Sequence, residues 1–389
     1  MSFLNINQVK KRSVLLVAIV CGLFFGGEQA IAQATKLSEA LRAVTAVGEN
    51  GIGNEAAAKA MQVINAAPSS ELPTILAAME NSNRISANWI RSGVNSIVAR
   101  DPNIPRAKIE SYFKEQSNNA MGRLLAFELL TDGNEELANR MIPKLLDDPS
   151  MPLRQKAIAA LITDAENFAQ TDQVKAMGSL GVAFNKARDV KQLESIAQKL
   201  SDLGVEVNLQ RQLGFLNQWQ VVGSFDNKDM RGFDVAYGPE EAIGMIDTAA
   251  TYQDLEGKEA EWGMVTTAHK TGVVDLNDRI GKVKGATVYA LGSFFADDEV
   301  EAEIRIGTPN ATKIWVNGEM VMSNEIYHNS NAIDKFIGKV KLKKGDNQIL
   351  VKVCQNEQQE SWAQDWQFQL RICDSSGKAI ASAKPRSQQ

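Results

Sequence analysis

The spacing of apolar residues changes near residue 217. Before it, apolar residues recur at i, i+3, i+4 and i+7, as they do in helices with one buried face. After it, apolar and polar residues alternate, and Gly, Asp, Thr and aromatic residues replace Ala and Leu, which is typical of strands. The sequence therefore predicts a helical-repeat domain over residues 33–216, a β domain over residues 217–378 and a flexible tail over residues 379–389.

The helical spacing is clearest in four segments, which are residues 56–67, 87–100, 122–130 and 153–161. Turns rich in Pro, Gly, Asp, Asn and Ser separate them and supply candidate N-caps. Alanine and leucine are frequent in all four, which favours closely packed helices.

The helical region also contains a weak repeat. Arg91, Arg123 and Arg154 each open an apolar helix, at spacings of 32 and 31 residues. The clearest unit, residues 141–162, has an apolar helix, an Asp-Asp-Pro turn, an arginine and an alanine-rich helix. It resembles HEAT-type repeats, which implies an α-solenoid whose exposed face docks a protein. An irregular helical bundle is the alternative.

Six segments read as strands or hairpins: residues 219–225, 286–295, 300–307, 313–321, 336–353 and 366–372. No helical segments alternate with them, so we expect an antiparallel arrangement, most simply two sheets packed as a sandwich.

Four motifs in this region resemble the framework of galactose-binding-like modules. They are Trp219–Phe225, residues 232–240, Trp315–Gly318 and residues 342–353. The resemblance implies an antiparallel jelly-roll β-sandwich over residues 217–378. Modules of this family bind glycans in some proteins and serve only as structural supports in others.

The hairpin around Asn317-Gly318 is apolar on both faces. A two-residue turn there places Trp315 opposite Met320 and Ile314 opposite Val321. One face then carries Ile314, Val316 and Val321, and the other carries Lys313, Trp315, Met320 and Met322. The β-branched face suits the core. The second face is either covered by another segment or forms an aromatic platform for a sugar ring.

Two polar loops carry further aromatic residues. Trp362 and Asp365 lie in an amide-rich stretch over residues 355–367, and Tyr327 lies beside His328. Stacking faces next to amides are what sugar recognition requires. The candidate ligand-binding residues are therefore Trp315, Met320, Tyr327, Trp362 and Asp365. The alternative is that both loops are ordinary surface.

The sequence offers little for catalysis. Its two histidines, His269 and His328, lack the spacing of a metal site, and no nucleophile elbow or phosphate loop is present. The carboxylates of residues 297–299 could serve acid–base chemistry or calcium, but we interpret them as a solvated turn. We predict no catalytic residue, metal ligand or cofactor.

The N-terminus, residues 1–32, resembles a secretory signal peptide. A basic segment, Lys10–Arg12, precedes an apolar run, and Ala30-Ile31-Ala32 is a cleavage motif before Gln33. We expect export to the periplasm, the cell surface or the medium. An uncleaved anchor is the alternative, and no later segment is apolar enough to span a membrane.

Export permits a disulfide between Cys354 and Cys373. The alternation of the flanking residues points both side chains away from the apolar faces, and strands in opposite sheets would turn the thiols away from each other. We therefore favour free thiols.

The formal charge of −5 gives no reason to expect nucleic acid or an anionic membrane as a partner. The leading hypothesis is an exported, non-catalytic protein whose sandwich binds a carbohydrate or surface polymer while its helical repeats dock a protein. One alternative is an assembly protein that uses both domains for protein contacts. A less favoured one is a carboxylate-based glycan-active enzyme.

Overall fold

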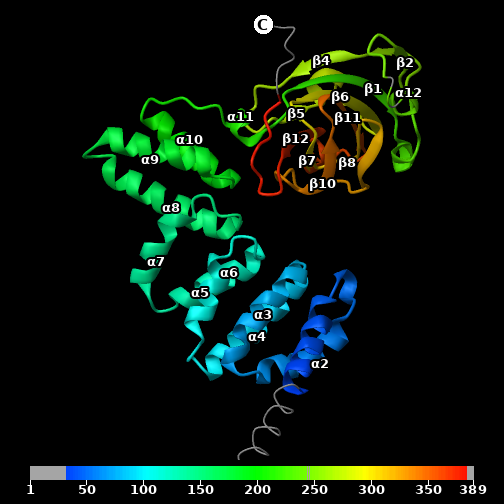
Figure 1. The fold of residues 1–389 in the computed structure, drawn as a ribbon. Helices are drawn as coiled ribbons and strands as arrows, with labels where there is room; N and C mark the ends of the chain where they lie inside the picture. Colours follow the sequence, from blue (N-terminus) through cyan, green and yellow to red (C-terminus); the bar gives the residue numbers. More distant parts are fainter. Residues whose placement is uncertain (1–31, 243, 245, 383–389) are drawn as a thin grey trace, which may run out of the picture. The chain divides into compact units, whose positions relative to one another are not determined.

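A computed structural model describes residues 32–242, 244 and 246–382 (Figure 1). The chain divides into two compact units, residues 1–156 and 157–389. The predicted signal peptide lies outside the described residues except for Ala32. At the start of the predicted tail, the Ile380 amide donates to the Ile372 carbonyl at 3.1 Å.

The described chain begins with helical elements. After a helix over residues 32–45 come η1 (Glu49–Gly51), α2 (Asn54–Ala66), η2 (Ser69–Glu71), α3 (Leu72–Ala77), η3 (Ala78–Asn81), α4 (Arg84–Arg100), α5 (Arg106–Lys114), α6 (Ala120–Thr131), α7 (Glu135–Met141), η4 (Ile142–Leu145), α8 (Met151–Phe168), α9 (Gln173–Lys186), α10 (Val190–Asp202) and α11 (Leu209–Leu213). The four predicted helical segments are confirmed as α2, α4, α6 and α8. Asparagine N-caps mark several starts: the Asn134 side chain, for example, accepts a hydrogen bond from the Leu137 amide at 3.0 Å.

In the first unit, neighbouring helices pack through small residues. Helix α2 packs on α4, and α5 packs on α6. A Cβ atom at Gly93 would lie 2.6 Å from Ile64 Cγ2, so glycine is what allows α4 to approach α2 this closely. Ile64, Ile90 and Val94 are fully buried at this contact.

Two of the three repeat arginines meet at one buried aspartate. The Arg123 guanidinium donates to both carboxylate oxygens of Asp148, at 2.5 and 2.6 Å, and to the Phe113 carbonyl at 3.0 Å. Arg154 Nε donates to the Asp148 carbonyl at 2.9 Å. Asp148 also accepts the Ser150 amide, which confirms its predicted role in the turn before α8. Arg91 instead pairs with the half-exposed Glu128.

The second unit contains two large antiparallel sheets and a separate two-stranded one, so a helical region followed by antiparallel sheets is confirmed (Figure 1). The strands are β1 (Gln218–Asp226), β2 (Thr251–Gln253), β3 (Glu259–Glu261), β4 (Gly263–Thr266), β5 (Val274–Asp275), β6 (Ala286–Ala296), β7 (Val300–Gly307), β8 (Ala311–Val316), β9 (Glu319–Asn324), β10 (Phe336–Leu342), β11 (Gly345–Gln355) and β12 (Gln367–Cys373). One sheet has the order β4-β1-β6-β11-β8-β9 and the other β10-β7-β12-β5, while β2 and β3 pair separately. Short elements connect them: η5 (Lys228–Phe233), α12 (Gly238–Glu241), α13 (Asn277–Ile280) and η6 (Ser361–Ala363).

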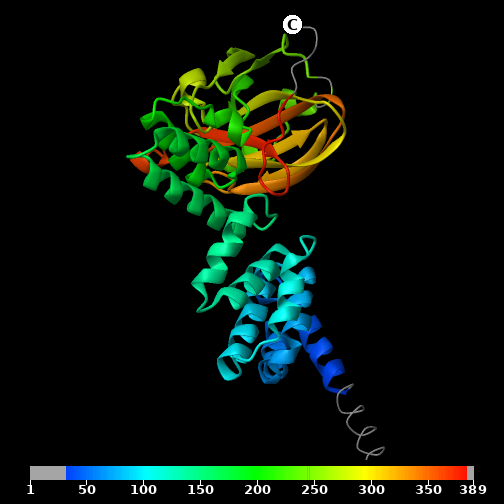
Figure 2. The same ribbon diagram turned by 60° about the vertical axis from the view of Figure 1, so that its left-hand side comes forward.

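The two sheets lie face to face and share one apolar core (Figure 2). The Trp219 ring of β1 meets the Phe368 ring of β12 edge-on, with centroids 5.0 Å apart. Val351 of β11 and Ile304 of β7 are fully buried in the same core. Trp366 is also fully buried there.

The register of the predicted hairpin is correct near the turn and wrong beyond it. Trp315 pairs with Met320, but Ile314 pairs with Met322 because a bulge interrupts the β8–β9 ladder. One extra residue on one strand moves every later side chain to the opposite face. Met322 consequently joins the core between the sheets instead of the outer face.

The sequence did not predict the short strands β2 to β5, which have two to four residues each. The described parts of residues 233–262, here called the covering segment, include β2 and β3. The aromatic side chains of this segment pack on the outer face of the six-stranded sheet.

Strands β10 and β11 are joined by a tight turn but belong to different sheets, and so do β11 and β12. Cys354 lies on β11 and Cys373 on β12, and both thiols are buried and free. Strands β11 and β12 thus have the arrangement on which the preference for free thiols rested, because opposite sheets turn the two thiols away from each other.

Candidate functional site

Trp315 does not form an exposed platform. Only 7% of its surface is accessible, because the covering segment packs over it together with Phe225, Tyr289 and Leu350. Its neighbour Met320 remains 58% exposed. Trp315 is thus covered by another segment, the first of the two alternatives for this hairpin face, whereas Met322, which was expected on the same face, lies in the core.

A buried lysine holds the covering segment in place. Lys352 is fully buried on the outer face of β11, and its Nζ donates to the carbonyls of Phe233 and Val235 at 2.9 and 2.7 Å. It also pairs with Glu240 Oε2 at 3.0 Å, which accepts the Tyr289 hydroxyl at 2.7 Å. Burial, followed by the bond to Glu240, raises the pKa of the Tyr289 phenol well above its usual range. Each polar group here has a partner, so we interpret this cluster as structural.

Trp362 is the exposed aromatic residue of the predicted set. It lies in η6, is 60% exposed, and meets the His328 ring edge-on with centroids 4.9 Å apart. His328 Nε2 lies 2.8 Å from Asn356 Oδ1, and Asn356 Nδ2 donates to Gln358 Oε1 at 3.1 Å. The fold thus joins the two predicted polar loops. The name Trp362 surface is used below for Trp362, His328, Asn356 and Gln358.

The other two predicted loop residues play different parts. Tyr327 turns inward: its ring packs against a small cluster around Phe233 and Cys354, and its hydroxyl accepts from Asn227 Nδ2 at 3.3 Å. Burial raises the pKa of this phenol above its usual range. Asp365 is exposed, and its carbonyl accepts from Asn310 Nδ2 at 3.1 Å.

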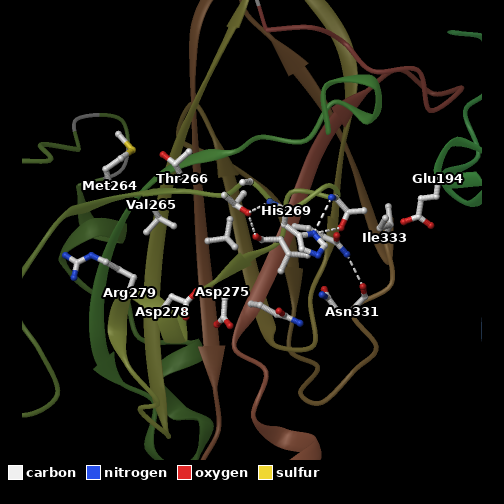
Figure 3. Close-up of a pocket in the computed structure, with 17 residues that line it drawn as sticks. Glu194, Met264, Val265, Thr266, His269, Asp275, Asp278, Arg279, Asn331 and Ile333 are labelled. Atoms are coloured by element: carbon white, nitrogen blue, oxygen red, sulfur yellow. Dashed lines mark hydrogen bonds between the residues drawn. The ribbon is translucent and has the colours of Figure 1, made fainter. Parts of the chain in front are cut away.

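A pocket of about 840 Å³ opens beside the small sheet, within the second unit (Figure 3). Seventeen residues line it, from α10, β4, β5, α13, β12 and two loops. Figure 3 shows Glu194 and Arg279 toward opposite ends, with Asp275, Asp278 and Asn331 between them. This volume lies in the range of small-molecule sites.

Several hydrogen-bonding groups in the pocket are already used. Thr267 Oγ1 donates to the Val273 carbonyl at 2.6 Å, and Thr271 bonds His269 Nδ1. Gln369 Nε2 donates to the Asn331 carbonyl at 2.9 Å. Two acceptors in the pocket, in contrast, are unpaired: Gln369 Oε1 and Asn331 Oδ1 are buried and have no hydrogen-bond partner among the described residues.

Sequence reasoning did not identify this pocket. The alternation of β12 does place Gln367 and Gln369 opposite the core residues Phe368 and Leu370, so their outward direction was predictable. Nothing local showed that β5 and the loop around Asn331 would enclose them.

The carboxylates of residues 297–299 form the expected solvated turn. Asp298 pairs with Lys344 at 3.0 Å and Glu299 with Lys341 at 2.6 Å, all with exposed side chains. Across residues 32–242, 244 and 246–382, no group of three or more His, Cys, Asp or Glu side chains could hold a metal ion. No helix in that part of the chain is long and apolar enough to cross a membrane.

No protein-family model and no curated protein matches the sequence. Among solved structures, an anti-sigma factor domain-containing protein is 15% identical over 43% of this chain, with a TM-score of 0.25. The chain spans about half of that protein, 46% of its length. A family 35 carbohydrate binding module from an environmental isolate is 18% identical over 27% of this chain and 75% of the module, with a TM-score of 0.18. Another, from Clostridium thermocellum, is 16% identical over 26% of this chain and 97% of the module, with a TM-score of 0.17. These similarities are too weak to assign the chain to a family.

Proposed function

We propose that the chain is an exported, non-catalytic binding protein whose β region, in a jelly-roll arrangement, binds a carbohydrate or cell-surface polymer at the Trp362 surface. The observation that carries the proposal is the 60% exposure of Trp362 beside a fixed histidine and two amide side chains. An indole face packs on the C–H face of a sugar, while amides bond its hydroxyls.

The geometry of the Trp362 surface is more typical of a ligand-binding site than of a tryptophan that is merely exposed to solvent. His328 meets the indole edge-on, and Asn356 fixes His328 in turn. A side chain held by its neighbours loses little conformational entropy when a ligand binds. The exposed Gln358 then provides hydrogen-bonding groups next to the stacking face, while the buried Asn356 holds His328 in place.

A glycan-array screen of the chain from Gln33 onward tests this function. We expect Trp362→Ala to abolish specific binding and His328→Ala to weaken it, because His328 only positions the indole. Ile337→Ala, which truncates a 52% exposed apolar side chain on β10, is the control and should bind as the parent does. Binding that survives Trp362→Ala contradicts the proposed site. A folded chain that binds no glycan favours the assembly alternative.

The helical region would then dock a protein through a HEAT-like arrangement of helix pairs. The packing of α5 on α6 and the shared Arg123–Asp148 pair support this part of the proposal. Export rests on the N-terminal sequence alone, and N-terminal sequencing of the protein from its host should find Gln33 first.

A further inference from the structure

We propose that the pocket in Figure 3 binds a small organic cation bearing a primary ammonium or guanidinium group. Carbohydrate binding at the Trp362 surface is not needed for this inference. It rests on two buried amide oxygens without a partner among the described residues and on three carboxylates that line the same pocket.

The pocket floor supplies the first observation. Gln369 is only 3% exposed, and its Oε1 has no partner in the described chain. Its amide orientation is fixed, because Nε2 donates to the Asn331 carbonyl at 2.9 Å. Asn331 Oδ1 is a second buried acceptor without a partner among the described residues. Buried acceptors of this kind are costly unless a donor reaches them.

The carboxylates supply a second, independent observation. Asp275, Asp278 and Glu194 line the same pocket. Asp275 uses Oδ1 to accept the Asn277 amide at 2.9 Å. Ammonium and guanidinium groups donate hydrogen bonds and accept none, so they match a site with these carboxylates and two unpaired amide oxygens.

The cations nearby occupy the ends of the pocket. Lys270 lies 3.8 Å from Glu194, and the exposed Arg279 donates to the Glu261 carbonyl at 3.3 Å. Figure 3 shows Glu194 and Arg279 away from the central residues Asp275 and Asn331. A ligand cation in the centre therefore meets acceptors, while the two protein cations are engaged elsewhere.

Isothermal titration of the chain from Gln33 onward tests the proposal with three probes in slightly acidic, low-salt buffer. Agmatine carries both cationic groups, glucosamine carries an ammonium, and N-acetylglucosamine is the neutral match of glucosamine. We expect at least one cationic probe to bind at one site. N-acetylglucosamine should bind with an affinity about tenfold lower, or give no measurable binding. Added salt should weaken the binding. Binding of agmatine alone would support a cation site that does not accept an ammonium on a sugar ring, since agmatine carries both cationic groups.

Variants locate the site. Asp275→Asn keeps the bond to the Asn277 amide but removes the charge, and Gln369→Met removes the floor acceptor. Each should weaken the cationic probe about tenfold. Asp298→Asn, which neutralises an exposed carboxylate in the β6–β7 turn, should have no effect. The proposal is overturned if no cationic probe binds, if N-acetylglucosamine binds as well as glucosamine, or if Asp275→Asn binds like the parent.

Discussion

Lys352 of β11 and Glu240 of α12 form a buried ion pair, with Nζ 3.0 Å from Oε2. The pair joins the six-stranded sheet to the covering segment, which in turn buries Trp315. A charged side chain at a position that alternation assigns to the outer face thus becomes an anchor for tertiary structure.

We expect Lys352→Met to destabilise the second unit by about 3 kcal/mol, since it leaves Glu240 and two backbone carbonyls without their buried donor. Urea denaturation followed by tryptophan fluorescence measures the loss. Lys313→Met on the neighbouring strand is the control: its partner Asp234 is 82% exposed, so the cost should stay below about 1 kcal/mol. Equal costs for the two variants would contradict an anchoring role for Lys352.

The two arginine pairs of the helical region should differ in the same way. Arg123→Met breaks a fully buried bidentate pair and is expected to cost about 3 kcal/mol. Arg91→Met breaks a half-exposed pair and is expected to cost less than about 1 kcal/mol. Hydrogen exchange of the amides in α5 and α6 reports the difference. Similar protection of these amides in both variants would show that the Arg123–Asp148 pair contributes little to the stability of the helical region.

Stability should fall in acid through Asp334. Burial alone would raise the pKa of this carboxyl, but hydrogen bonds and charges from Arg371 and Arg305 outweigh burial and hold the pKa below its usual value. A pKa lowered by folding stabilises the protein above about pH 4, and the contribution disappears as pH falls through the lower folded value. The free energy of unfolding, measured at neutral and at acidic pH, should therefore fall more steeply with falling pH for the parent protein than for Asp334→Asn. Parallel pH profiles would rule out this contribution.

Both cysteines should resist alkylation in the folded protein. Burial raises the pKa of the Cys354 and Cys373 thiols to about 11, so little thiolate forms near neutral pH. For the chain from Gln33 onward, we expect iodoacetamide to label neither thiol before unfolding and both afterwards, as counted by mass spectrometry. Rapid labelling of the native chain would show that the strands carrying them open.

Local sequence predicted much of the β region. Alternation identified β1, β6, β7, β8, β10, β11 and β12, and Asn317-Gly318 fixed the hairpin turn as far as the Trp315–Met320 pair. The predicted register of the hairpin failed at the bulge, because the pairing of β8 with β9 beyond Trp315 depends on which side chains the core accepts.

The candidate sites were less accessible to sequence reasoning. Trp362 was identified as a candidate ligand-binding residue because an indole among amide side chains can be recognised from the local sequence. Its contact with His328 and the enclosure of Gln369 both depend on loops that meet only after folding.

The sequence by itself determined the change from helical to strand periodicity, the caps and turns, and the apolar faces of most strands, because these depend on residues a few positions apart. Tertiary structure alone decided that Trp315 is covered, that β11 and β12 lie in different sheets, and that a pocket forms beside β5. The bond from Lys352 to the Phe233 carbonyl spans 119 residues. No local pattern encodes such a contact, because its free energy is gained only when both partners are buried together.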